Sequence, residues 1–152
     1  MVFVSQPVLL VEDDDGDQLL IRQAMSQLQT SIDINAVTTL AAARDYLSGA
    51  GKYASAPRPR CVVLDLRLPD GRGEALLDWM AERPDLDALP VITLSGAPLT
   101  RGWPNVVATL SKPTTAEGYD ALGGMLGRLI VAAVDGPLHR NDNFVVDDPP
   151  QA

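Results

Sequence analysis

Five short apolar segments alternate along the chain with segments of helical periodicity, and this alternation restricts the fold more than any other feature. The apolar segments are short and rich in β-forming residues, whereas the segments between them repeat apolar residues at three- and four-residue spacing. Strands that alternate with helices form a parallel sheet with helices on both faces. We therefore expect a doubly wound α/β fold with strands at 7–12, 31–39, 59–68, 89–96 and 105–112, and helices within 14–28, 40–51, 73–83 and 114–134.

The connection between the last two strands breaks this rhythm. Its sequence, "APLTRGWP", holds two prolines and a glycine in eight residues, whereas an average helix takes about 11 residues. We expect the fourth helix to be shortened or absent. Trp103 in this loop has two interpretations: it packs against the protein, or it stays exposed and anchors a partner.

Length and charge limit the function classes. The 152 residues suit one domain, which we place at 1–134, followed by a polar tail at 135–152 that is disordered or packs as an arm. The net charge of −8 and the lack of a Lys/Arg cluster argue against nucleic acid and anionic membrane as partners. No apolar run reaches the roughly 18 residues needed to cross a bilayer, and no signal peptide is evident. The single cysteine suits a reducing compartment. We therefore expect a cytoplasmic protein with a protein or small-molecule partner.

Polar residues stand where four of the expected strands end. Glu12 and Asp13 end the first strand, Asp65 the third, Ser95 the fourth and Lys112 the fifth. Because ligands of open parallel sheets bind at the carboxyl ends of the strands, these side chains should share one crevice. Three close carboxylates favour a hard cation such as Mg²⁺, with Asp13 and Asp65 as direct ligands and Glu12 acting through water. With a lysine and a hydroxyl opposite, Asp65 is placed to act as a nucleophile toward a phosphoryl group.

Four motifs, "VLLVEDDDGDQLLIRQAM", "CVVLDLRLPDGRG", "LPVITLSGA" and "LSKP", resemble the receiver domain of two-component response regulators, over roughly residues 6–134. The resemblance implies the flavodoxin-like (CheY-like) sheet with strand order 2-1-3-4-5. It also implies that a histidine kinase or phosphotransfer protein supplies a phosphoryl group. The site residues it implies are the phosphoacceptor Asp65, the switch hydroxyl Ser95, the cation Lys112, and a Mg²⁺ site of Glu12, Asp13, Asp65 and the backbone carbonyl of Arg67.

The sequence departs from the family pattern at one position that bears on signalling. Three residues before Lys112 the family commonly has an aromatic side chain that rotates on activation, and here the residue is Thr109. The usual relay from Ser95 to that aromatic is therefore in doubt, and a different surface is expected to carry the output. The resemblance further implies a cis peptide between Lys112 and Pro113.

The leading functional hypothesis is a stand-alone response regulator, not an enzyme, that signals or relays phosphoryl groups through a downstream protein target. The alternative is an interaction module of the same fold that works without phosphorylation. An aspartyl-phosphate phosphatase would need an aspartate where Arg67 stands, and a flavin domain would need a phosphate-binding loop in place of the acids after the first strand.

Several further residues receive structural interpretations. Asp14, Asp15 and Asp17 are expected to cap and solvate the start of the first helix, and Asp70 to form a turn. Glycines in the last helix would allow another helix to approach closely, so a homodimer is a further prediction.

Overall fold

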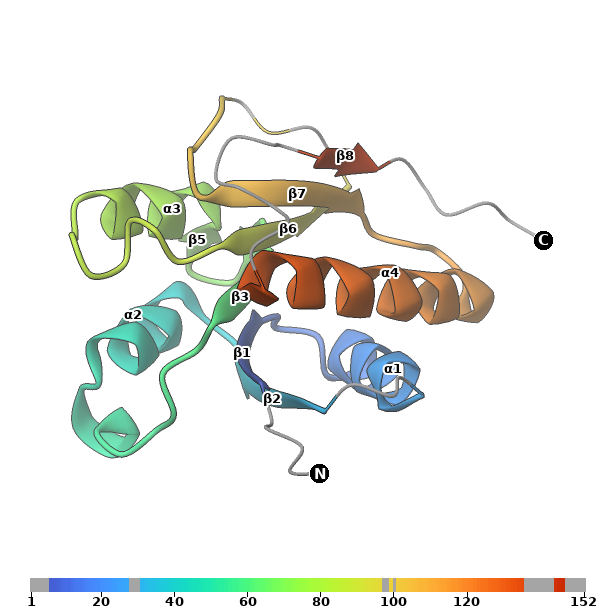
Figure 1. The fold of residues 1–152 in the computed structure, drawn as a ribbon, viewed down its shortest axis with the longest axis horizontal. Helices are drawn as coiled ribbons and strands as arrows, with labels where there is room; N and C mark the ends of the chain where they lie inside the picture. The colour runs from blue at the N-terminus through green and yellow to red at the C-terminus, as the bar shows by residue number, and fades with distance from the viewer. Residues whose placement is uncertain (1–5, 28–30, 97–98, 100, 136–143, 147–152) are drawn as a thin grey trace.

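The computed structural model describes residues 6–27, 31–96, 99, 101–135 and 144–146 of the chain. Its centre is a parallel sheet with the order β2-β1-β3-β6-β7-β8 (Figure 1). The first five positions reproduce the expected order 2-1-3-4-5, so the predicted doubly wound fold is confirmed. The strands are β1 (Gln6–Val11), β2 (Ile32–Val37), β3 (Cys61–Asp65), β6 (Val91–Ser95), β7 (Val106–Ser111) and β8 (Phe144–Val146).

Helices cover both faces of the sheet, as the alternation predicted. One face packs against α1 (Asp15–Ser26) and α4 (Ala116–Asp135), and the other against α2 (Leu40–Ser48) and α3 (Glu74–Ala81). A short 3₁₀ turn, η1 (Gly51–Tyr53), follows α2. No helix in the described part of the chain is both long and apolar enough to span a bilayer.

The central strand β3 shows why the core has two layers. All five of its residues are buried, and successive side chains point to opposite faces of the sheet. Val62 and Leu64 join the cluster under α2 and α3, whereas Cys61 and Val63 join the cluster under α1 and α4. Burial on both sides explains the continuous apolar run before Asp65, and it fixes the position of the residue that ends the strand.

Local signals in the sequence set the helix ends. Asp14 caps α1 by accepting a hydrogen bond from the backbone N–H of Asp17 at 2.8 Å. Thr39 caps α2 in the same way, accepting from the N–H of Ala42 at 3.0 Å. Gly49 ends α2 with a positive φ of 66°, a conformation that costs glycine little.

The fourth crossover contains no helix among its described residues, as the sequence predicted. Trp103 takes over part of the covering role of a helix: it is only 6% exposed and joins the core under α2 and α3. Its indole N–H donates to Asp78 Oδ1 of α3 at 3.0 Å, and Arg101 both pairs with Asp78 and stacks on the Trp103 ring. The interpretation of Trp103 as an exposed anchor is therefore wrong, because the short loop leaves apolar strand surface that the ring buries.

The sixth strand comes from the segment that we interpreted as a tail. β8 runs parallel to β7, with Ala108 opposite Phe144 and Leu110 opposite Val146. The rest of the tail, residues 136–143 and 147–152, lies outside the described residues, so the boundary at residues 134–135 stays a prediction. The peptide between Lys112 and Pro113 is trans, so the expected cis bond is wrong; trans is the more stable form of most X–Pro bonds.

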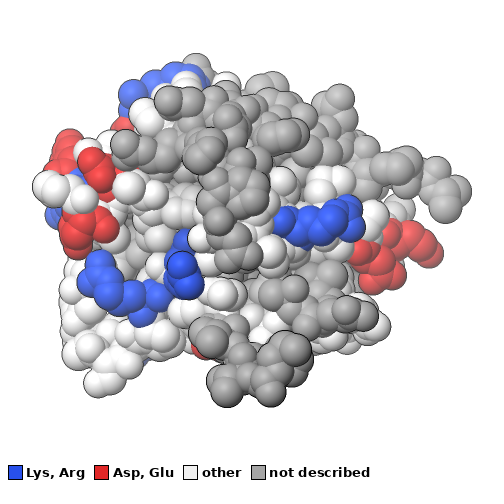
Figure 2. Space-filling model, viewed as in Figure 1, with Lys and Arg blue, Asp and Glu red and all other residues white. Residues whose placement is uncertain are grey.

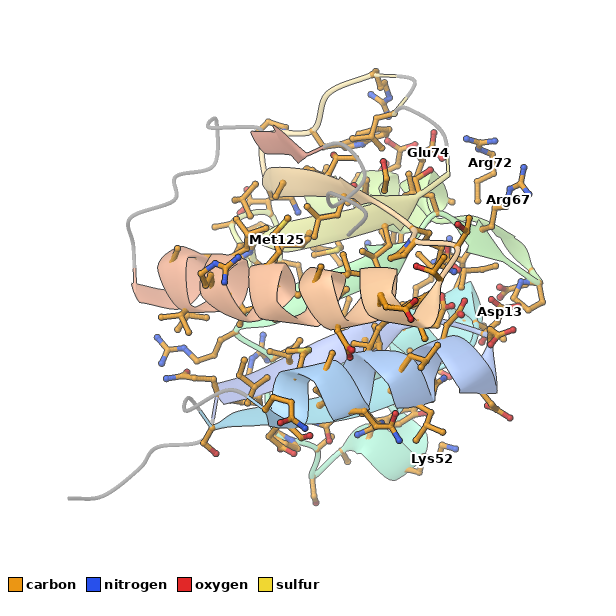
Figure 3. All side chains as sticks on the ribbon, turned by 90° about the vertical axis from the view of Figure 1, so that its right-hand side faces the viewer. Asp13, Lys52, Arg67, Arg72, Glu74 and Met125 are labelled. Carbon is orange, nitrogen blue, oxygen red and sulfur yellow. The ribbon has the colours of Figure 1, made fainter. Side chains whose placement is uncertain are left out.

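Helices α1 and α4 lie side by side (Figure 3). Their closest approach involves Gly123 of α4 and Ala24 of α1. A Cβ atom at Gly123 would lie 2.0 Å from the Ala24 Cβ and 3.0 Å from the Ala24 backbone carbon. The helix that this glycine admits is therefore α1 of the same chain. Gly124 differs, because a Cβ there would meet only the end of the Arg128 side chain at 3.7 Å.

We expect Gly123→Ala to lower the free energy of unfolding by about 1–3 kcal/mol, because the added methyl group overpacks the contact between α1 and α4. The matched variant Gly124→Ala should raise it by about 0.5–1 kcal/mol, since alanine loses less backbone entropy in a helix. Urea unfolding of both variants beside the wild type tests this pair. Equal effects of the two substitutions would contradict the tight contact at Gly123.

Candidate functional site

The carboxyl ends of four strands bring the predicted site residues to one edge of the sheet. Glu12 and Asp13 follow β1, Asp65 ends β3, Ser95 ends β6 and Lys112 follows β7. Backbone hydrogen bonds fix these ends to one another: the Leu66 N–H donates to the Leu94 carbonyl, and the Lys112 N–H to the Ser95 carbonyl, each at 3.1 Å. These residues therefore lie at one edge of the sheet, as the sequence predicted.

The Lys112 ammonium is the centre of this group of side chains. Its Nζ lies 2.8 Å from Glu12 Oε1, 3.0 Å from Asp65 Oδ2 and 3.1 Å from Asp17 Oδ2. An ammonium has three N–H donors, so these three carboxylates use all of them. Lys112 thus ties the ends of β1, β3 and β7 to the first turn of α1.

Glu12, Asp13 and Asp65 form an acidic cluster. Each offers a carboxylate oxygen, and these oxygens all lie within 4.8 Å of one another. Glu12 and Asp65 are buried and Asp13 is exposed. Glu12 Oε2 is buried and has no hydrogen-bond partner within the described part of the chain. Three oxygen donors with one unpaired buried atom, open to solvent on the Asp13 side, suit a hard divalent cation.

Burial shifts the proton equilibria of this cluster. Desolvation, together with the neighbouring Asp65 carboxylate, raises the pKa of Glu12 to about 9. Burial alone would lower the pKa of Lys112, but its hydrogen bonds with Glu12 and Asp65 raise it above the usual value. Lys112 is therefore charged at neutral pH, while Glu12 favours its protonated form when no cation is bound.

The Asp65 carboxylate is held from two sides. Its Oδ1 accepts the backbone N–H of Arg67 at 2.9 Å, and its Oδ2 accepts from Lys112. The Arg67 side chain is exposed on the short hairpin of β4 (Arg67–Leu68) and β5 (Gly71–Arg72). Ser95 is half-buried and follows Leu94, the residue that pairs with Asp65.

A shallow pocket opens beside the acidic cluster. It is lined by Asp13, Arg67, Arg72 and the apolar residues of the hairpin. Figure 3 shows these three labelled side chains at one end of the molecule, with Glu74 close by. The Arg72 guanidinium makes two contacts with the Glu74 carboxylate, at 3.0 and 3.3 Å. Of the three clustered carboxylates, that of Asp13 lines this pocket.

Two aspartates have contacts that the sequence analysis missed. Asp17, interpreted as part of the helix start, binds Lys112. The sequence spacing could have indicated this contact. Asp17 lies four positions before Ile21 and seven before Ala24, so it is on the buried face of α1. Asp70 lies in the turn between β4 and β5, as interpreted, and it also accepts the backbone N–H groups of Leu40 and Ala41 at the start of α2.

Asp17 also connects the site to α4. Burial alone would raise its pKa, but the neighbouring groups of Glu12, the buried Tyr119 and Lys112 lower it below the usual value. Burial and the same contact with Asp17 raise the pKa of Tyr119. Thr109, where the family commonly has an aromatic residue, accepts a hydrogen bond from the Thr93 hydroxyl at 3.0 Å.

Known proteins resemble the chain in sequence and in structure, although no family model matches it. The probable methanogenesis regulatory protein FilR2 of Methanothrix harundinacea is 36% identical over 118 residues, which span 72% of this chain and 74% of FilR2. The response regulator Rcp1 of Synechocystis is 32% identical over 88 residues, 58% of this chain and 60% of Rcp1, so less than two thirds of Rcp1 is matched.

Among solved structures, the phosphorylated cyanobacterial phytochrome response regulator RcpA has a TM-score of 0.72 at 25% identity, covering 89% of this chain and 99% of RcpA. RcpA is thus similar to this chain over the fold described above, and FilR2 and Rcp1 are similar to it in sequence. With them, this chain belongs to the family of response regulator receiver domains, which act in signalling and not as enzymes.

Proposed function

We propose that this chain accepts a phosphoryl group on Asp65 from a histidine kinase or phosphotransfer protein, in a Mg²⁺-dependent reaction, and signals through a downstream protein. The observation that carries the proposal is the setting of Asp65. Its buried carboxylate lies between the Lys112 ammonium and the Arg67 N–H, next to Glu12 and Asp13.

The acidic cluster fits the metal that this reaction needs. Asp13, Asp65 and the backbone carbonyl of Arg67 would hold Mg²⁺, with Glu12 acting through a bound water. The unpaired buried oxygen of Glu12 supports this assignment, because an unsatisfied carboxylate oxygen is costly without a cation or a donor. Bound Mg²⁺ would supply positive charge to the phosphoryl oxygens.

The chain's own residues account for the remaining parts of the transfer. An Asp65 oxygen attacks the phosphorus atom while the bond to the donor histidine nitrogen breaks. That nitrogen keeps the electron pair and takes a proton from water, and Asp65 becomes an acyl phosphate. In this proposal Lys112 donates to the phosphoryl oxygens on one side and the Ser95 hydroxyl donates on the other.

Charge supports a protein as the partner. The net charge is −8, and Figure 2 shows Lys and Arg in separate groups on the face in view, with acidic side chains toward both ends. A surface of this kind attracts nucleic acid weakly. A homodimer stays a prediction.

Two observations favour the alternative, an interaction module that works without phosphorylation. Thr109 replaces the usual aromatic and bonds to Thr93, and Trp103 fixes the fourth crossover to Asp78 of α3. A rigid crossover would present the same binding surface whether Asp65 is phosphorylated or not. The experiments below separate the two functions.

Incubation with Mg²⁺ and acetyl phosphate should add one phosphoryl mass to the wild type, because the Asp65 carboxylate lies between the Lys112 ammonium and the Arg67 N–H. Asp65→Asn should abolish the gain, and Asp45→Asn, which removes an exposed carboxylate of α2, should retain it. Intact-protein mass spectrometry makes the measurement. Absence of the gain in the wild type, with a panel of purified histidine kinases as donors as well, would leave the interaction module as the function.

Mg²⁺ should raise the melting temperature of the wild type in proportion to site occupancy, since it binds the folded state alone. Asp13→Asn should weaken the affinity by about tenfold or more, as loss of a metal ligand does. Asp15→Asn removes an equal charge from a neighbouring exposed residue and should change the affinity little. A thermal-shift titration compares the three proteins; equal losses in both variants would argue against a defined site.

The stability of the metal-free protein should fall as pH rises from about 5 to 9. Burial raises the pKa of folded Glu12 from 4.5 to about 9, so the folded state holds a proton that the unfolded state releases. Stability from this group is complete below pH 4.5 and is lost on approaching pH 9. Glu12→Gln removes the titrating carboxyl group. As pH rises, the free energy of unfolding of this variant should therefore fall less than that of the wild type. Urea unfolding in EDTA at several pH values measures the difference, and parallel curves would refute the assignment to Glu12.

A further inference from the structure

Asp17 occupies the third donor of the Lys112 ammonium. The other two bind Glu12 at 2.8 Å and Asp65 at 3.0 Å, and Asp17 lies at 3.1 Å. With all three N–H groups in use, Lys112 has none to offer to a further acceptor. A phosphoryl oxygen that binds Lys112 must therefore displace one of these three carboxylates.

Burial indicates which carboxylate is displaced. The Glu12 side chain is fully buried and that of Asp65 is 4% exposed, whereas that of Asp17 is 26% exposed. A carboxylate that loses its cation costs least where water can solvate it. Asp65 must also stay in place because it carries the phosphoryl group. Asp17 is thus the partner that Lys112 can leave.

Asp17 is also connected to a second helix. Tyr119 of α4 is buried and packs in the same apolar cluster as Ile21 and Met25 of α1. Burial and the neighbouring Asp17 raise the pKa of Tyr119. A hydrogen bond from the Tyr119 hydroxyl would satisfy part of the Asp17 carboxylate and so weaken its attraction for Lys112. A change at Asp17 therefore reaches the contact between α1 and α4.

We propose that Asp17 is a positioning residue: it holds Lys112 in a resting position, and through Tyr119 it couples the release of Lys112 to the contact between α1 and α4. The coupling rests on the proposed phosphorylation of Asp65, whereas the resting position does not. Because Asp17 competes with the phosphoryl group for Lys112, its charge slows phosphorylation. Tyr119, which weakens that competition, has the opposite effect.

The resting position is tested without any phosphoryl donor. Lys52 and Lys112 are the two lysines of the chain, so NMR of isotope-labelled lysine ammonium groups gives two signals. In Asp17→Asn the Lys112 ammonium protons should exchange with water about tenfold faster or more, because a charge-assisted hydrogen bond is lost. The exposed Lys52 is the internal control, and Asp15→Asn the matched charge control. Unchanged exchange at Lys112 in Asp17→Asn would overturn the resting position.

The coupling is tested by a double-mutant cycle on the initial rate of mass gain with Mg²⁺ and acetyl phosphate. Asp17→Asn should raise the rate about three- to tenfold, and Tyr119→Phe should lower it by a similar factor. In the Asp17→Asn background, Tyr119→Phe should have no further effect, because it acts through Asp17. Circular dichroism and melting temperature establish that each variant is folded.

The outcomes separate this proposal from the proposed function. Additive effects in the cycle, or a slower Asp17→Asn, would overturn the coupling while the phosphorylation of Asp65 stands. A wild type that accepts no phosphoryl group from acetyl phosphate or kinases would overturn the proposed function and the coupling together. Faster Lys112 exchange in Asp17→Asn would still support the resting position in that case.

Discussion

The hydrogen bonding of one ammonium by three carboxylates is the interaction on which the functional end of this molecule depends. Parallel strands carry Glu12, Asp13 and Asp65 to the same edge of the sheet, where their charges would repel one another. Lys112 offsets part of that repulsion and joins β1, β3 and β7 to α1. The remaining excess of negative charge suits a divalent cation, which the proposed phosphoryl transfer requires.

The two faces of the sheet differ in how their helices and loops contact the residues at this edge. On one face the fourth crossover is a loop held by Trp103 and Asp78, and Thr109 bonds to Thr93. On the other face α1 and α4 meet at Gly123, and Asp17 of α1 binds Lys112. The second face therefore has a direct polar contact with the site through α1. The coupling proposed above would carry the output through α1 and α4.

Sequence reasoning missed the side-chain contacts that join distant parts of the chain. Asp17 and Lys112 are 95 positions apart, and Asp70 caps a helix that begins 30 positions earlier. Local rules assign such aspartates to the nearest helix start or turn, because short polar side chains favour both. Trp103 was ambiguous for the same reason: whether a loop aromatic is exposed depends on the strand surface that the loop must cover.

The sequence by itself determined the alternating α/β order, the strand ends beside Asp65, Ser95 and Lys112, and a fourth crossover whose described residues form no helix. These follow from apolar periodicity and from prolines and glycines, which act through neighbouring residues. Only the tertiary structure decided that Asp17 and Tyr119 belong to the site and that Gly123 admits α1. Hydrogen bonds and close packing between helices depend on distances of a few tenths of an ångström, and the folded chain alone sets those distances.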